Sequence, residues 1–76
     1  MLVTYDPEAD ATYITVSEAA VATTDALSDL VAVDLDAAGT PVGVEVLKAP
    51  GRVDAGDEEM TVARYPRLRA VFDTLR

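Results

Sequence analysis

The chain has 76 residues, which is enough for one small domain. It contains no cysteine and no histidine, which excludes disulfides, a thiolate metal site and the commonest general base. The formal net charge is −8, and residues 1–47 contain acidic side chains but no basic one, so we expect this half not to bind nucleic acid. Half of the residues are hydrophobic, which fits either a face buried against a second copy or a valine-rich monomer.

The first predicted element is a β-hairpin. Residues 2–5 are rich in β-branched and aromatic side chains, which favour a strand. Asp6 and Pro7 end it, because proline fixes φ for a type I turn and the aspartate can bond the amides that follow. Residues 11–17 then alternate, and Tyr13 lies on the face that we expect to be partly covered. The opposite face, assigned to the core, carries Thr12, Ile14 and Val16.

Three further strands are predicted after this hairpin. Residues 21–27 fit either a strand or irregular structure, whereas residues 30–36 and 42–47 alternate clearly. Gly39 is free to take the positive φ of the loop between the last two strands. Gly43 indicates a bulge or a close approach of two backbones.

The last part of the chain is predicted to be a linker followed by a helix. Residues 49–65 contain a Pro-Gly turn and a polar run, which is typical of a connecting segment. Pro66 suits the first turn of a helix over residues 66–76, and Arg76 suits the dipole at its end. The apolar residues at helical spacing are Leu68, Val71, Phe72 and Leu75. So short a helix is marginal alone and must dock its apolar stripe on a sheet, either that of its own chain or that of another subunit.

The predicted fold class is therefore α+β: a small antiparallel β-meander of four to five strands with one C-terminal helix packed on the sheet. Residues 1–76 form a single domain, in which residues 2–48 are the meander. The start of the chain lacks the basic region of an export signal, and no apolar run approaches the roughly 20 residues of a membrane span. We expect a cytoplasmic protein that does not contact membranes.

Three stretches together carry a family resemblance: Tyr5-Asp6-Pro7-Glu8-Ala9-Asp10-Ala11-Thr12-Tyr13-Ile14, Val33-Asp34-Leu35-Asp36 and Val42-Gly43-Val44-Glu45-Val46. They resemble the small bacterial family catalogued as domain of unknown function 2283 (DUF2283), over about residues 2–48. Thr12 departs from the family pattern, which usually has a large aliphatic residue there. The resemblance brings no established activity. Some members lie beside a small toxin-like gene and are labelled as antitoxins, which implies a protein-neutralising role.

The acidic turn of the opening hairpin resembles the start of a calcium loop, because Asp6, Glu8 and Asp10 alternate. An EF-hand needs glycine at its sixth position and glutamate at its twelfth, where this chain has Ala11 and Ser17. The EF-hand motif is therefore absent. Turn formation explains these residues, and a weak divalent-cation site is the alternative.

A second acidic group, Asp34, Asp36 and Glu45, is predicted on the polar side of neighbouring strands. Acid–base catalysis needs a carboxyl group whose pKa is raised, and the sequence supplies neither an apolar pocket nor a cationic partner for one. We therefore expect no enzymatic activity and no cofactor, with an orphan enzyme as the alternative. Tyr5 and Tyr13 fit either a recognition patch or half-buried packing.

The basic end of the chain places Arg64, Arg67 and Arg69 around Tyr65. These arginines fit a solvated helix face, a contact with a second subunit, or a contact with nucleic acid.

The function that we expect is that of a small acidic protein-interaction domain, antitoxin-like and self-associating as a dimer, with a basic protein such as a toxin as its partner. The candidate interaction surface is Tyr5, Asp6, Asp10, Tyr13, Asp34, Asp36 and Glu45. No residue is assigned to a metal.

Overall fold

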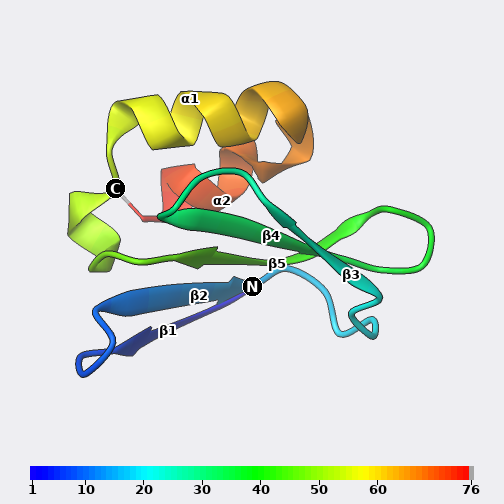
Figure 1. Cartoon of the computed structure of the whole chain (residues 1–76), viewed down its shortest axis with the longest axis horizontal. Helices are drawn as coiled ribbons and strands as arrows, with labels where there is room; N and C mark the ends of the chain where they lie inside the picture. The colour runs from blue at the N-terminus through cyan, green and yellow to red at the C-terminus, as the bar shows by residue number, and fades with distance from the viewer. Residues whose placement is uncertain (76) are drawn as a thin grey trace.

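The chain folds into a five-stranded antiparallel sheet with helices on one side of it (Figure 1). The structure is a computed structural model that describes residues 1–75. The strands are β1 (Leu2–Asp6), β2 (Ala11–Thr15), β3 (Thr23–Ala26), β4 (Val31–Leu35) and β5 (Pro41–Val46). The helical segment contains η1 (Pro50–Arg52), α1 (Ala55–Arg64), η2 (Pro66–Leu68) and α2 (Arg69–Thr74). The predicted α+β class is confirmed, with five strands.

The sheet order is β1-β2-β5-β4-β3, so a β1–β2 hairpin lies beside a meander of β3, β4 and β5. All neighbouring strands are antiparallel. The segment between β2 and β3 carries the chain to the far edge of the sheet, so β1 and β3 are the two edge strands. Residues 21–27 do contain a strand, which the sequence left open.

The two predicted hairpin turns are confirmed, and each is held by an aspartate. Asp6 accepts a hydrogen bond at Oδ1 from the amide of Glu8 (3.0 Å), and Asp36 accepts at Oδ1 from the amide of Thr40 (2.9 Å). Gly39 takes a φ of 81°, which glycine adopts without steric cost. These local bonds fix the ends of the strands and hence the register of the sheet.

The core lies between the sheet and the helical segment. Its buried residues are Ile14, Val31, Val33, Val44, Val46, Val62, Leu68, Val71 and Phe72. Thr12 is also fully buried, and its Oγ1 donates to the carbonyl oxygen of Lys48 (2.6 Å). The expectation that Val16 belongs to the core was wrong: it is 39% exposed, because β2 ends at Thr15.

The predicted linker over residues 49–65 was wrong, because α1 occupies most of it. Glu58, Thr61 and Val62 are its buried residues, at the i, i+3, i+4 spacing of one helix face. The acidic run at its start suits the positive end of the helix dipole. A pattern that reads as a solvated loop is thus a helix whose buried face is largely polar in composition.

The helix predicted from Pro66 is present, as η2 followed by α2. Leu68, Val71 and Phe72 are each 1% exposed, so the predicted apolar stripe does pack on the sheet. The expectation for Arg76 lies outside the described residues. Among the helices of residues 1–75, none is both long enough and apolar enough to cross a membrane.

Candidate functional site

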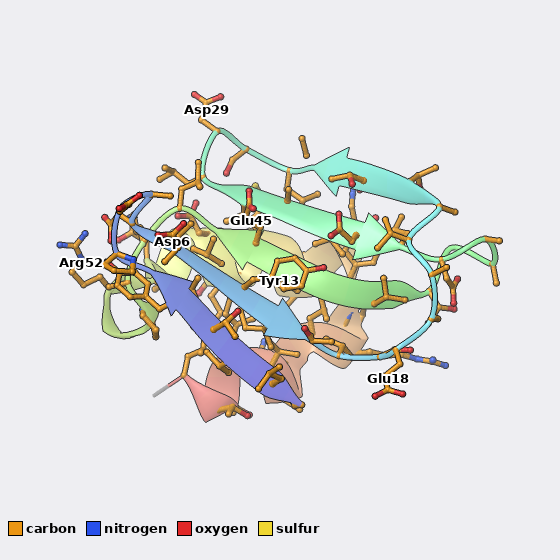
Figure 2. The ribbon with its side chains drawn as sticks, turned by 90° about the horizontal axis from the view of Figure 1, so that it is seen from below. Asp6, Tyr13, Glu18, Asp29, Glu45 and Arg52 are labelled. Carbon is orange, nitrogen blue, oxygen red and sulfur yellow. The ribbon has the colours of Figure 1, made fainter. Side chains whose placement is uncertain are left out.

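The face of the sheet that points away from the helices is the candidate site, and we call it the open face (Figure 2). Successive side chains of a strand point to opposite faces, so the residues between the core positions belong to it. They include Leu2, Thr4, Asp6, Ala11, Tyr13, Thr15, Thr24, Ala32, Asp34, Gly43 and Glu45. Within residues 1–75 no other element covers this face.

Tyr13 is the largest side chain at the centre of the open face, and its ring lies over β5 (Figure 2). The far end of the ring sits above Gly43: a Cβ atom placed on that glycine would come 2.0 Å from Oη and 2.5 Å from Cζ of Tyr13. Glu45 lies directly opposite Tyr13, and Gly43 lies two residues before Glu45 on β5. Of the two alternatives predicted at Gly43, the β4–β5 register does shift beside it, between Asp34 and Leu35. The close approach to Gly43 is made by an aromatic side chain and not by a second backbone.

The phenol of Tyr13 is fixed by a hydrogen-bonded row across the sheet. Its Oη donates to Oδ2 of Asp34 (2.6 Å), and Oγ1 of Thr24 donates to Oδ1 of the same carboxylate (2.6 Å). Burial and the hydrogen bond to Asp34 raise the pKa of Tyr13 to about 12. The tyrosine is therefore neutral at physiological pH, and its hydroxyl group donates its proton to the hydrogen bond with Asp34.

The predicted acidic group is divided by the structure. Asp34 and Glu45 share the open face on the neighbouring strands β4 and β5. Asp36 does not join them, because it lies in the β4–β5 turn and binds backbone amides there. Glu45 is exposed and lies directly opposite Tyr13 in the β2–β5 register. The centre of the open face thus combines one fixed aromatic ring with two carboxylates.

Tyr5 and Asp10 do not belong to the open face, although Asp6 does. Oη of Tyr5 donates to Oδ1 of Asp10 (2.6 Å), and Nη2 of Arg52 donates to Oδ2 of Asp10 (2.8 Å). The hydrogen bond to Asp10 raises the pKa of Tyr5. This cluster ties the first hairpin to η1 at the rim of the molecule.

The acidic turn does not gather its carboxylates around one point. Asp6 binds the amide of Glu8, whereas Asp10 turns to Tyr5 and Arg52. Within residues 1–75, no three acidic side chains are placed as a metal ion would need them.

The basic side chains that form ion pairs come from the helical segment and from Lys48 just before it. Their partners within the chain are Asp54 for Lys48, Asp10 for Arg52 (2.8 Å), Asp25 for Arg64 (3.1 Å) and Glu58 for Arg69 (3.9 Å). By contrast, Asp6, Asp34 and Glu45 take part in no ion pair in the described part of the chain. Figure 2 also shows the loop residues Glu18 and Asp29 around the open face. Negative charge is therefore concentrated on the open face and its loops.

The basic end near Tyr65 makes a contact within its own chain. Arg64 and the Oη of Tyr65 both donate to Oδ2 of Asp25 on β3, and the tyrosine bond is 2.6 Å long. The hydrogen bonds from Tyr65 and Arg64 lower the pKa of Asp25. These hydrogen bonds join the end of α1 to the edge strand β3, a contact that was not predicted from the sequence.

These observations define a small α+β domain with one sheet face in the core and the other displayed. A sequence model of the family described as protein of unknown function (DUF2283) matches residues 2–49, which are the whole sheet and its connections. The chain belongs to this family. No curated protein and no solved structure matches it.

Proposed function

We propose that this chain is a small, non-catalytic protein-interaction domain whose open face binds a basic surface of a partner protein, as an antitoxin binds a toxin. The observation that carries the proposal is the distribution of charge. Asp6, Asp34 and Glu45 form no ion pair within residues 1–75, whereas the acidic groups that do form one, among them Asp10, Asp25, Asp54 and Glu58, lie off the open face. A face of one charge sign attracts a partner of the opposite sign, speeds association and rejects anionic partners.

A carboxylate enzyme or a cation site is the alternative, and the hydrogen bonding of Asp34 favours the binding role. Both oxygens of Asp34 already accept a hydroxyl donor, one from Tyr13 and one from Thr24. The chain also has no histidine or cysteine to act as base or nucleophile. A rise of the melting temperature with added Ca²⁺ or Mg²⁺ would favour the cation site instead.

The test is a titration of the ¹⁵N-labelled protein with a short oligo-lysine peptide, followed by NMR. We expect amide shifts on the open face around Tyr13 and Glu45, and binding that weakens as salt is added. Glu45→Gln should weaken binding. Glu59→Gln is the matched control, because Glu59 is exposed on α1 and loses the same charge on the helical side. Shifts confined to the helices, or equal effects of the two variants, would contradict the proposal.

We also propose that the chain self-associates through the edge of β1. The first four residues of this strand include no charged residue and no proline, two of the features that usually protect an edge strand from pairing. Met1 and Leu2 are 64% and 60% exposed and add apolar surface at the same edge. The proposed setting is the cytoplasm, which suits a chain that uses no disulfide.

The register indicates which amides of β1 are available. Val16 donates its amide to β5 (2.9 Å), and main-chain groups along an antiparallel strand point alternately to its two neighbours. Tyr13 therefore directs its main-chain groups to β1, where Thr4 lies opposite. Val3 and Tyr5 consequently direct their main-chain N–H and C=O groups away from β2, where these groups can pair with a second copy of the chain.

Light scattering and hydrogen exchange together test the self-association. We expect the mass of a dimer, and slower exchange at Val3 and Tyr5 as the protein concentration rises. Thr24 and Ala26 on the other edge strand are the control, and their exchange should not depend on concentration. A monomer at all concentrations would refute self-association. A dimer in which Val3 and Tyr5 exchange freely would place the interface elsewhere.

A further inference from the structure

We infer that the open face recognises arginine in preference to lysine on its partner, through Tyr13 and Glu45. The inference rests on the proposed function and narrows it from a basic surface to one kind of basic side chain.

The first step is the state of the Tyr13 ring. Its hydroxyl is bound to Asp34 at 2.6 Å, and its far end is seated over Gly43. One side of the ring therefore covers β5, and the other side is turned to solvent (Figure 2). An aromatic ring held in one position loses little side-chain entropy when a ligand stacks on it.

The second step is the position of Glu45. It stands directly opposite Tyr13 on the same face, and its carboxylate is exposed and in no ion pair within residues 1–75. A cation that stacks on the ring can therefore reach this carboxylate. The ring supplies the π face and Glu45 supplies the charge.

The third step is access, because short side chains surround the pair. Ala32 lies opposite Glu45 on β4, and Gly43 precedes it by two residues on β5. Ala11 is the next open-face residue beside Tyr13 on β2. A flat group can therefore approach the ring without meeting a long side chain from these neighbours.

The chemistry of this arrangement favours a guanidinium group. Arginine is planar, stacks on aromatic rings, and binds a carboxylate through two parallel N–H groups. The ammonium group of lysine is compact and strongly hydrated, so it can satisfy Glu45 but gains less from the ring. Arginine therefore interacts with both the ring of Tyr13 and the carboxylate of Glu45, whereas lysine interacts mainly with the carboxylate.

The test compares oligo-arginine and oligo-lysine peptides of equal length by calorimetric titration at one salt concentration. We expect the arginine peptide to bind about threefold more tightly for each side chain that stacks. Tyr13→Leu should remove this preference, so that the two peptides bind the variant with equal affinity. Tyr5→Leu is the control, because Tyr5 is 41% exposed and hydrogen-bonded to an aspartate but lies off the open face; it should keep the preference.

A second measurement covers the case in which Tyr13→Leu does not fold. In the wild-type protein, NMR should show nuclear Overhauser contacts between the arginine δ-methylene protons and the ring protons of Tyr13. Equal affinity for the two peptides, or no contact with this ring, would overturn the arginine inference and leave the proposed function standing. Failure of both peptides to bind would overturn both.

Discussion

Gly43→Ala is the substitution that tests the central contact of the open face most directly. The new Cβ atom would lie 2.0 Å from Oη, 2.5 Å from Cζ and 2.9 Å from Cε1 of Tyr13, so the ring must move. The ring can rotate away, but it then gives up the hydrogen bond to Asp34. The penalty therefore comes from a lost hydrogen bond more than from the clash itself.

The expected magnitude follows from two opposing terms. A hydrogen bond to a charged group contributes about 1.5–3 kcal/mol. Replacing a strand glycine by alanine returns about 0.5–1 kcal/mol through the smaller backbone entropy of the unfolded chain. The net expectation is a loss of about 1–2 kcal/mol, which lowers the melting temperature of a domain of this size by about 5–15 °C.

A double-mutant cycle with Tyr13→Ala is the assay. The three atoms nearest to the new Cβ all belong to Tyr13, so its removal should make Gly43→Ala neutral or slightly stabilising. Urea unfolding of the four proteins gives the coupling energy, expected to be about 2 kcal/mol. If Gly43→Ala destabilises the Tyr13→Ala protein as much as the wild type, the reasoning about this contact is refuted.

Three further predictions concern the core and the pH dependence. Thr12→Val should cost about 1 kcal/mol in urea unfolding, because the carbonyl of Lys48 loses its donor while the shape is kept; an unchanged midpoint would contradict this. Phe72→Ala should lower the free energy of unfolding by about 3–5 kcal/mol, close to the whole stability expected for a chain this short. The circular dichroism spectrum of this variant at 37 °C should therefore be that of a largely unfolded chain. The pKa of Tyr13 rises from 10.0 to about 12 on folding, so its contribution is complete below pH 10 and is lost as the pH rises through 12. Solvent screening limits that contribution to about 1 kcal/mol, and Tyr13→Phe should show a smaller alkaline loss of the melting temperature than the wild type.

The sheet was largely predictable because alternation is a strong signal where one face is buried. Edge strand β3 was ambiguous because three of its four residues are exposed, which removes the contrast between faces. Helix α1 was missed because its buried face includes Glu58 and Thr61. Hydropathy treats such residues as solvated, and only the packing against the sheet shows that they are covered.

The candidate site was predictable in part. Tyr13, Asp34 and Glu45 were singled out from their types and their strand positions, and Gly43 was expected to lie at a close approach. The bond between Tyr13 and Asp34 could not be predicted, because it requires β5 to lie between β2 and β4. That order depends on a crossover between strands, which no local pattern encodes.

The family match and the core have different boundaries, and this has a consequence for engineering. The matched segment ends at residue 49, yet Val62, Leu68, Val71 and Phe72 of the following segment complete the core. Because the pleat sends alternate residues to opposite sides, this helical layer contacts one set of sheet residues and the displayed face uses the other. Exchanging the helices for another amphipathic cover of the same shape should therefore leave the displayed face, and the binding proposed for it, unchanged in the chimera.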